Sequence, residues 1–171
     1  MSKSKRMVRI GLCVALLAIS AWLTVPAPVP FTMQTMAVLT VSALLGSGQG
    51  CACVGLYLLL GAIGVPVFSG FRGGFSALLG PTGGYLIGFL LSALVAGWAG
   101  KRFQKGWLLA VWFAAAIAIC YGFGTLWYAL LYSNGGIGTI LLTCVVPFLL
   151  PDALKIALSL LLVRRLRTVV H

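Results

Sequence analysis

The single acidic residue of the chain is followed three positions later by a lysine. Asp152 is the only Asp or Glu among 171 residues, and Lys155 completes the segment Pro-Asp-Ala-Leu-Lys. Residues three apart share one face of a helix, and ionisable groups inside apolar segments are costly and commonly functional. Lys155 suits the carboxylate of a ligand, while Asp152 can accept hydrogen bonds from amide or urea N–H groups. The alternative is a structural ion pair that neutralises itself.

The proline before this pair predicts where the last helix begins. Proline in the first helical turn loses no hydrogen bond, so we expect Pro151 to open the helix. Asp152 and Lys155 would then lie beside free backbone N–H groups and the positive end of the helix dipole. That environment suits an anionic ligand group.

Residues from earlier segments could join this pair. Arg72 lies in a glycine-rich loop, as either an ordinary solvated arginine or a lid residue that closes on an anion. Gln34 begins the second apolar run. Trp127 and Tyr128 could stack on a ligand, although aromatic residues near helix ends also form interfacial belts in membranes.

The sequence lacks the residue combinations that catalysis needs. Asp152 has no second carboxylate to pair with, and the only histidine is the terminal His171, so no acid–base pair or Ser/His/Asp set can form. The five cysteines lack the Cys/His spacing of a zinc site. The glycine-rich segment 80–84 lacks the Gly-Lys-Ser/Thr ending of a phosphate loop. We therefore expect no enzyme, no metal and no cofactor in this chain.

The composition places these residues in a lipid bilayer. Apolar residues make up 61% of the chain and charged residues 8%, and the mean hydropathy is +1.13. Soluble domains carry about a quarter charged residues, so this chain cannot cover its surface in water. Its net charge of +11 comes from short basic clusters between apolar runs. Membrane topology explains these clusters better than a nucleic-acid partner does.

Six apolar runs predict an all-α bundle of six transmembrane helices in one domain, residues 1–171. A span needs about 20 mostly apolar residues, and small neighbours can extend a shorter run. The first run also fits a signal peptide, but Pro26-Ala27-Pro28 is a poor cleavage site and five runs follow. We expect a basic tail at 1–6 and helices at approximately 7–25, 33–47, 50–64, 83–100, 107–132 and 148–166.

The basic residues orient this bundle. With the N-terminus in the cytoplasm, ten Lys or Arg residues fall on the inner side and Arg72 alone on the outer side. This asymmetry follows the positive-inside rule, so we expect both termini in the cytoplasm. The outer segments are then a stiff proline-rich loop at 25–32, a glycine-rich loop at 64–84 that could cover a cavity, a turn at 133–136, and a rim segment at 137–146.

Several segments together resemble the BioY family, the biotin-specific S components of energy-coupling-factor (ECF) vitamin importers. They cover the chain from about residue 10 to 165. Family members usually have Pro-Gly-Asp in the last of them, whereas here Pro151 directly precedes Asp152. The segments are Val29–Thr35, Gly61–Gly70, Arg72–Gly74, Leu79–Phe89, Gly124–Trp127 and Pro151–Lys155.

The resemblance implies a protein of the prokaryotic plasma membrane that binds biotin near the outer face. It also implies three partner subunits, one transmembrane coupling subunit and two ATPases, which use the ATP. The alternative is a secondary transporter that works alone, for which Asp152 is the only acidic candidate for a proton relay. The implied binding residues are Gln34, Arg72, Asp152 and Lys155, and more weakly Tyr85 and Trp127.

The same resemblance implies a docking face on the first helix. S components often carry Ala-x-x-x-Ala where the coupling subunit binds. This chain has Gly11-x-x-x-Ala15, followed by Ala18 and Ala21, and small residues let two membrane helices approach closely. We therefore expect Gly11, Ala15 and Ala18 to contact the coupling subunit.

Overall fold

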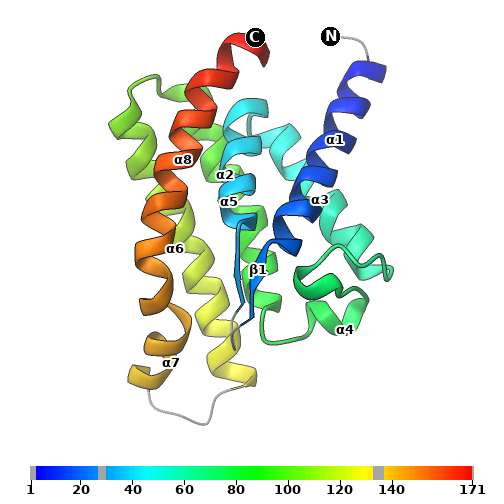
Figure 1. Cartoon of the computed structure of the whole chain (residues 1–171), viewed down its shortest axis with the longest axis vertical. Coiled ribbons are helices and arrows are strands. Elements are labelled where there is room, and N and C mark those ends of the chain that lie inside the picture. The colour runs from blue at the N-terminus through cyan, green and yellow to red at the C-terminus, as the bar shows by residue number, and fades with distance from the viewer. Residues whose placement is uncertain (1–2, 27–29, 133–136, 171) are drawn as a thin grey trace.

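Helices form along nearly all of the apolar runs, and they lie side by side in one bundle (Figure 1). The computed structural model describes residues 3–26, 30–132 and 137–170. Two short strands, β1 (Thr24–Val25) and β2 (Phe31–Thr32), pair antiparallel, with Thr24 opposite Thr32. The helices are α1 (Lys3–Trp22), α2 (Gln34–Leu45), α3 (Ser47–Ala62), α4 (Phe75–Leu78), α5 (Gly83–Arg102), α6 (Gly106–Leu131), α7 (Ile137–Cys144) and α8 (Val146–Val170), with a 3₁₀ turn, η1 (Ser69–Phe71).

Helices α2 and α5 form the centre of the bundle. Ten of the 12 residues of α2 are buried, and α5 packs against α2, α3 and α6. Helix α1 covers α2 and α3 on one side, and α8 covers α2 on the other. The first residues of α1 and the last residues of α8 lie at the same end of the bundle (Figure 1).

Glycines let α5 approach the turn between α2 and α3. A Cβ added to Gly100 would lie 2.3 Å from the carbonyl oxygen of Ala43, and one added to Gly97 would lie 2.4 Å from the Ser47 nitrogen. The turn itself depends on Gly46, whose φ of +87° is a conformation that other residues rarely adopt. These contacts bring the two central helices together without a side-chain layer between them.

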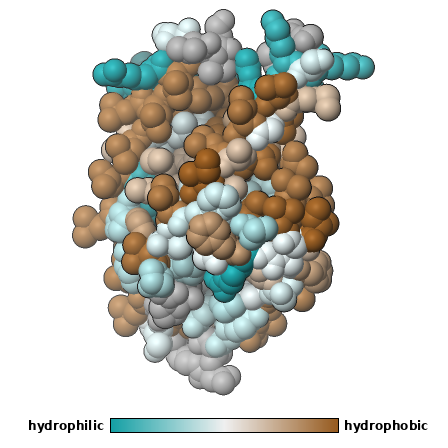
Figure 2. Space-filling model, turned by 45° about the vertical axis from the view of Figure 1, so that its right-hand side comes forward, coloured by the Kyte–Doolittle hydropathy of each residue, from teal (hydrophilic) through white to brown (hydrophobic). Residues whose placement is uncertain are grey.

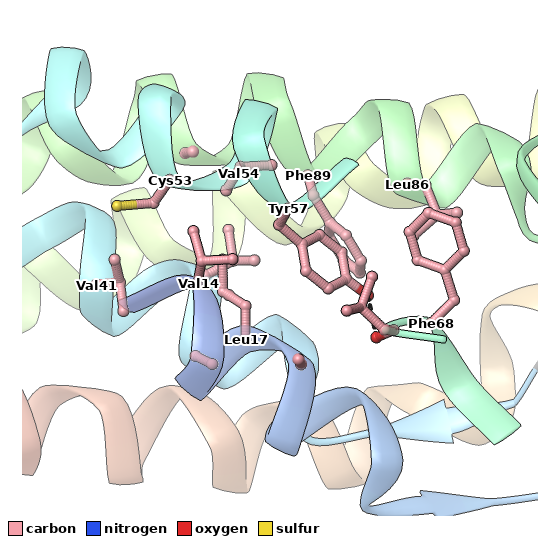
Figure 3. Close-up of a cluster of buried hydrophobic side chains, with 14 of the residues drawn as sticks. Val14, Leu17, Val41, Cys53, Val54, Tyr57, Phe68, Leu86 and Phe89 are labelled. Carbon is pink, nitrogen blue, oxygen red and sulfur yellow. Dashed lines mark hydrogen bonds between the residues drawn. The ribbon is translucent and has the colours of Figure 1, made fainter. Parts of the chain in front are cut away.

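A buried apolar cluster joins α1, α2, α3 and α5 to the loop after α3 (Figure 3). Tyr57 of α3 packs edge-to-face on Phe68 of that loop, with ring centroids 5.5 Å apart. The Tyr57 hydroxyl donates a 3.0 Å hydrogen bond to the Val67 carbonyl (Figure 3). A buried tyrosine needs such a partner, so this contact fastens the start of the loop to the core.

The outer surface has the pattern of a membrane protein. Hydrophobic side chains cover the upper half and the sides of the view in Figure 2, and strongly hydrophilic ones gather at the end where α1 begins and α8 ends, with a smaller hydrophilic patch in the lower middle. Helices α2 and α3 are apolar but shorter than a full span. Three stretches of the described chain are long and apolar enough to cross a membrane: Gly83–Arg102, Gly106–Leu131 and Gly138–Thr168.

The first and last helices differ from the sequence prediction. The basic residues expected in a separate tail are already helical from Lys3, because Lys and Arg are good helix formers. Helix α8 begins at Val146, so Pro151 lies inside it instead of opening it. Pro147, the second residue of α8, occupies the early helical position predicted for Pro151. The turn expected at 133–136 lies outside the described residues.

Candidate ligand-binding site

A cavity lies between α2, α5, α6 and α8 and is covered by the loop after α3. About 740 Å³ of empty space lies between its walls, a figure that includes space open to solvent. Its lining combines aromatic and aliphatic side chains with a few polar ones, as in most ligand sites. The lining residues are Pro30, Thr32, Gln34, Thr35, Phe68, Ser69, Arg72, Ala77, Thr82, Tyr85, Leu86, Phe89, Ile117, Cys120, Tyr121, Phe148, Asp152 and Lys155.

Asp152 and Lys155 form a buried ion pair in this cavity. Asp152 is 5% exposed and Lys155 3%, and Lys155 Nζ lies 2.7 Å from Asp152 Oδ1. The other carboxylate oxygen accepts a hydrogen bond from the Tyr121 hydroxyl. The ammonium also lies 4.0 Å from the centroid of the Phe31 ring, a favourable cation–π contact. These neighbours offset part of the large cost of removing two charges from water.

The carboxylate keeps some capacity to bind a ligand. The contact between Asp152 Oδ1 and Lys155 lacks the geometry of a hydrogen bond, and Oδ1 has no other partner. An ionised carboxylate can accept about four hydrogen bonds. Asp152 can therefore accept an N–H group from a molecule in the cavity without giving up its contact with Tyr121.

Gln34 brings a second unpaired polar group to the same cavity. Its side chain is 3% exposed and lies near the Tyr57 hydroxyl, but its Nε2 makes no hydrogen bond of normal geometry within the described residues. Thr32, the last residue of β2, accepts a hydrogen bond of 3.4 Å from the backbone N–H of Gln34 and thereby fixes the start of α2. Because a buried unpaired donor is costly, Gln34 is suited to donate to a ligand.

Arg72 lines the same cavity from the covering loop but is itself exposed. Its Nε donates a 3.2 Å hydrogen bond to the Ser69 carbonyl, which holds the start of the guanidinium within the loop. The loop is closed by a 2.9 Å hydrogen bond from the Phe68 N–H to the Arg72 carbonyl. The cavity thus contains one cation at its buried side, Lys155, and one at its exposed side, Arg72.

Tyr85 forms part of the cavity wall. Its hydroxyl donates a 2.9 Å hydrogen bond to the Cys144 carbonyl of α7. Its ring lies so close to Gly124 of α6 that a Cβ at that position would be 2.4 Å from it. Tyr85 therefore presents its ring to the cavity, while its hydroxyl is already paired with protein.

Trp127 lies elsewhere, so the interpretation that it stacks on a ligand does not match its position. Its indole N–H donates a 3.0 Å hydrogen bond to the Gly80 carbonyl, and its side chain packs on Gly84, where an added Cβ would lie 2.3 Å away. Tyr128 stacks on Tyr132, with centroids 6.3 Å apart. Both are absent from the cavity lining.

Tyr121, which holds the Asp152 carboxylate, is not among the site residues predicted from the sequence. A signal was present: Tyr121 lies well before the aromatic group formed by Trp127, Tyr128 and Tyr132 at the end of α6. A phenol in the middle of an apolar span lies too deep for an interfacial belt and indicates a buried partner.

The predicted helix terminus is not at the site. Asp152 lies six residues after the first residue of α8, Val146. The unpaired N–H groups of a helix belong to its first four residues, so they do not surround Asp152 or Lys155. An anion that binds beside Asp152 or Lys155 is therefore not held by the first turn of α8.

The three residues expected to contact a coupling subunit do not share one surface. Gly11 and Ala15 are exposed on α1, and nothing lies within 4 Å of a Cβ added to Gly11. Ala18 is 6% exposed and belongs to the core cluster that includes Val14 and Leu17. The outward face of small residues therefore consists of Gly11 and Ala15, with Ala18 packed inward.

The described residues contain no group of three or more His, Cys, Asp or Glu side chains that could hold a metal. The polar groups in the cavity include an ion pair, two phenols, an amide, an arginine and the hydroxyls of Ser and Thr residues, among aliphatic and aromatic side chains. Such a set can bind and orient a small amphipathic molecule that carries N–H groups and an anionic end.

Comparison with known proteins gives consistent matches over the whole chain. The model of the BioY family matches residues 1–171. "Biotin transporter BioY" of Thermotoga maritima is 38% identical over 165 residues, covering 95% of this chain and 96% of that protein. "Probable biotin transporter BioY" of Pyrococcus horikoshii is 33% identical over 166 residues, covering 96% and 98%.

A solved structure has the same fold. The crystal structure of the S-component for biotin from an ECF-type ABC transporter is similar with a TM-score of 0.89 and 29% sequence identity. The match covers 98% of this chain and 95% of that one. The chain therefore belongs to the BioY family.

Proposed function

We propose that this membrane protein binds biotin from the outside of the cell and is the substrate-capture component of an ECF-type importer. The observation that carries the proposal is the cavity itself, in which a buried Asp152–Lys155 pair lies with the unpaired amide of Gln34. Family membership supports biotin as the ligand, because the relatives at 38% and 33% identity carry biotin transporter names.

The geometry of the ion pair favours one orientation of biotin. Biotin carries a ureido group at one end and a carboxylate at the other, separated by an aliphatic chain. Asp152 and Lys155 are only 2.7 Å apart, so both contact the same end of the ligand. We place the ureido group there, with an N–H donated to Asp152 and the carbonyl oxygen accepting from Lys155.

The carboxylate of biotin then lies toward the exposed side of the cavity. Arg72 is the cation available there, and guanidinium groups bind carboxylates with two parallel hydrogen bonds. The sequence alone favours Lys155 as the partner of the ligand carboxylate. The closeness of Lys155 to Asp152 favours Arg72 for that role instead.

Titration calorimetry of the purified protein with biotin, thiamine and riboflavin tests the ligand. We expect stoichiometric binding of biotin without ATP or metal. Failure of the folded protein to bind biotin, or tighter binding of thiamine or riboflavin, would contradict the proposal.

We further propose six membrane-spanning helices, cytoplasmic termini and energy supplied by a coupling subunit with two ATPases. Gly11 and Ala15 support docking on α1, because both are exposed and small.

Ala15→Trp should abolish ATP-dependent uptake by the complete transporter and leave biotin affinity unchanged. Gly122→Trp places the same bulk on exposed α6 and should leave uptake intact. Uptake by vesicles that contain this chain alone, driven by a pH gradient, would instead indicate a secondary transporter.

A further inference from the structure

The loop that covers the cavity is a closed unit with its own hydrogen bonds. We call residues 64–74 the cover loop. The Phe68 N–H donates to the Arg72 carbonyl at 2.9 Å, and the Gly74 N–H donates to the Gly61 carbonyl at 2.7 Å. A Cβ at Gly73 would lie 2.4 Å from the Val65 carbonyl oxygen, so the two arms of the loop lie directly against each other.

The cover loop is fixed to α3 through Phe68. The Phe68 ring occupies a notch at Gly61, where a Cβ would lie 2.0 Å from the ring, and it packs against Tyr57. These contacts hold the base of the loop. Through the hydrogen bond from the Phe68 N–H they also hold the Arg72 carbonyl, but they do not hold Phe71, the residue between them that precedes Arg72.

The apex contains a strained residue. Phe71 has φ +57° and is the only non-glycine residue with positive φ in the described part of the chain. An aromatic residue in this region is a genuine outlier that needs support from its surroundings. Phe71 is 64% exposed and does not line the cavity, so packing in the site does not supply that support.

Trp22, at the end of α1, supplies the support that Phe71 needs. Its ring stacks on Phe71 with centroids 4.9 Å apart and an interplanar angle of 25°. Its indole N–H donates a 2.9 Å hydrogen bond to the carbonyl of Pro66, on the other arm of the cover loop. One side chain from α1 therefore holds both arms.

We infer that Trp22 is a positioning residue for Arg72, which it holds over the cavity by keeping Phe71 in its left-handed conformation. The inference rests on the proposed function, in which Arg72 binds the ligand carboxylate. Arg72 follows Phe71 directly, so relaxation of Phe71 to an ordinary conformation turns the Arg72 side chain away. The ureido end of the site, at Asp152 and Lys155, does not depend on Trp22.

Binding of biotin and of its uncharged amide to Trp22 variants tests this role. Trp22→Leu should weaken biotin binding by about tenfold, the scale of one aromatic pair and one hydrogen bond, and should change binding of the amide far less. Trp22→Phe keeps the stacking and should lose less. In an Arg72→Gln background, Trp22→Leu should cause no further loss. Two outcomes would show that Trp22 has only a structural role. One is an equal loss of affinity for biotin and for the amide in Trp22→Leu. The other is a further tenfold loss of biotin affinity when Trp22→Leu is added to Arg72→Gln.

Trypsin provides a readout without ligand, because Arg72–Gly73 is a cleavable bond in the cover loop. Cleavage after Arg72 in the ligand-free protein, followed as the fragment 1–72, should be faster in Trp22→Leu by about tenfold, since cleavage follows local opening. Trp107→Leu removes an exposed tryptophan far from the loop and should cleave at the wild-type rate. An unchanged rate in Trp22→Leu would overturn the inference. If the wild-type protein bound no biotin, the proposed function would fail, and the cleavage rates would still decide the role of Trp22.

Discussion

Asp152 and Lys155 are buried beside each other, and each makes the other tolerable in a low-dielectric site. Tyr121 and Phe31 add a hydrogen bond and a cation–π contact, so the pair is held in one geometry before a ligand arrives. A preformed polar site binds more tightly because little ordering remains to be done. The same burial makes removal of one partner costly, since it leaves the other charge alone.

Neutralising Lys155 and Arg72 should have different effects on ligand choice. Lys155→Met should weaken biotin and biotin amide equally, by about 2–5 kcal/mol, because it leaves Asp152 buried and unpaired. Arg72→Gln should weaken biotin and spare the amide, since only biotin carries the carboxylate. Competition titrations with both ligands on each purified variant measure this. If Lys155→Met spares the amide instead, the lysine contacts the carboxylate, as the sequence alone suggested.

The unpaired amide of Gln34 predicts that replacing it raises the stability of the ligand-free protein and lowers its affinity for biotin. Gln34→Leu removes a buried donor without a partner, so the ligand-free protein should gain thermal stability, by about 1–3 kcal/mol at most. The same change should reduce the stabilisation produced by biotin, which we expect to accept the Gln34 N–H.

Thr40→Val is the matched control. Thr40 is buried on the same helix and its hydroxyl also lacks a partner, but it does not line the cavity. It should not change the stabilisation by biotin. Unfolding temperatures with and without biotin measure both variants, and equal behaviour of the two would show that Gln34 does not contact the ligand.

The site residues differ in how far the sequence could reveal them. Asp152, Lys155 and Gln34 could be singled out because polar groups are rare in apolar runs and each needs a reason. The depth of Tyr121 in the apolar run separates it from Trp127 and indicates a buried partner, but the sequence could not show that this partner is Asp152, because only packing decides which aromatic residue of α6 faces the cavity. Trp127 faces the glycines of α5, and Tyr121 faces Asp152.

At the level of elements, α6 should tolerate an added methyl group at one glycine and not at its neighbour. A Cβ at Gly124 would lie 2.4 Å from the Tyr85 ring, whereas nothing lies within 4 Å of one at Gly122. The Tyr85 ring cannot easily withdraw, because its hydroxyl is bound to Cys144. Gly124→Ala should therefore lower both the unfolding temperature and biotin affinity.

Gly122→Ala should be neutral or slightly stabilising, since glycine weakens a helix. Thermal unfolding and calorimetry of the two variants give the comparison. Similar losses at both positions would mean that α6 itself is sensitive to any change, and that the Tyr85 contact is not the cause.

The existence of the long helices followed from apolar run length, but the start of α8 did not. Pro147 and Pro151 are both compatible with a first helical turn, and the sequence offers no way to choose between them. The structure begins α8 at Val146 and leaves Pro151 inside the helix. There it removes one backbone donor, a cost that the packing of Asp152 and Lys155 into the bundle can offset. Such a balance depends on tertiary contacts that local sequence does not contain.

For the whole molecule, the distribution of charge indicates how it lies in the bilayer. The basic residues at the start of α1 and in the last two turns of α8 lie at one end of the bundle (Figures 1 and 2). At that end Arg167 of α8 donates hydrogen bonds to the Gly100 carbonyl at 2.6 Å and to the Gln104 side chain at 2.8 Å. These hydrogen bonds join α8 to the end of α5 and to the connection between α5 and α6.

A labelling experiment tests the orientation. In a background without the five native cysteines, Arg72→Cys should react with a membrane-impermeant maleimide on intact cells, because the cover loop is expected outside. Lys105→Cys, at the opposite end, should react only after the cells are opened. The reverse pattern would invert the topology, and labelling of neither position would place both inside the protein or the bilayer.

The shortness of α2 has a consequence for biogenesis. At 12 residues, and a rise of about 1.5 Å per residue, its helical part is shorter than the hydrocarbon core is thick, and most of its surface faces protein. In a nascent chain that ends after α2, this short segment by itself would be held only weakly in the hydrocarbon core. Helix α3 follows after the single residue Gly46. We therefore expect α2 to insert only when α3 has also been synthesised, so that the two enter the bilayer together as one helical hairpin.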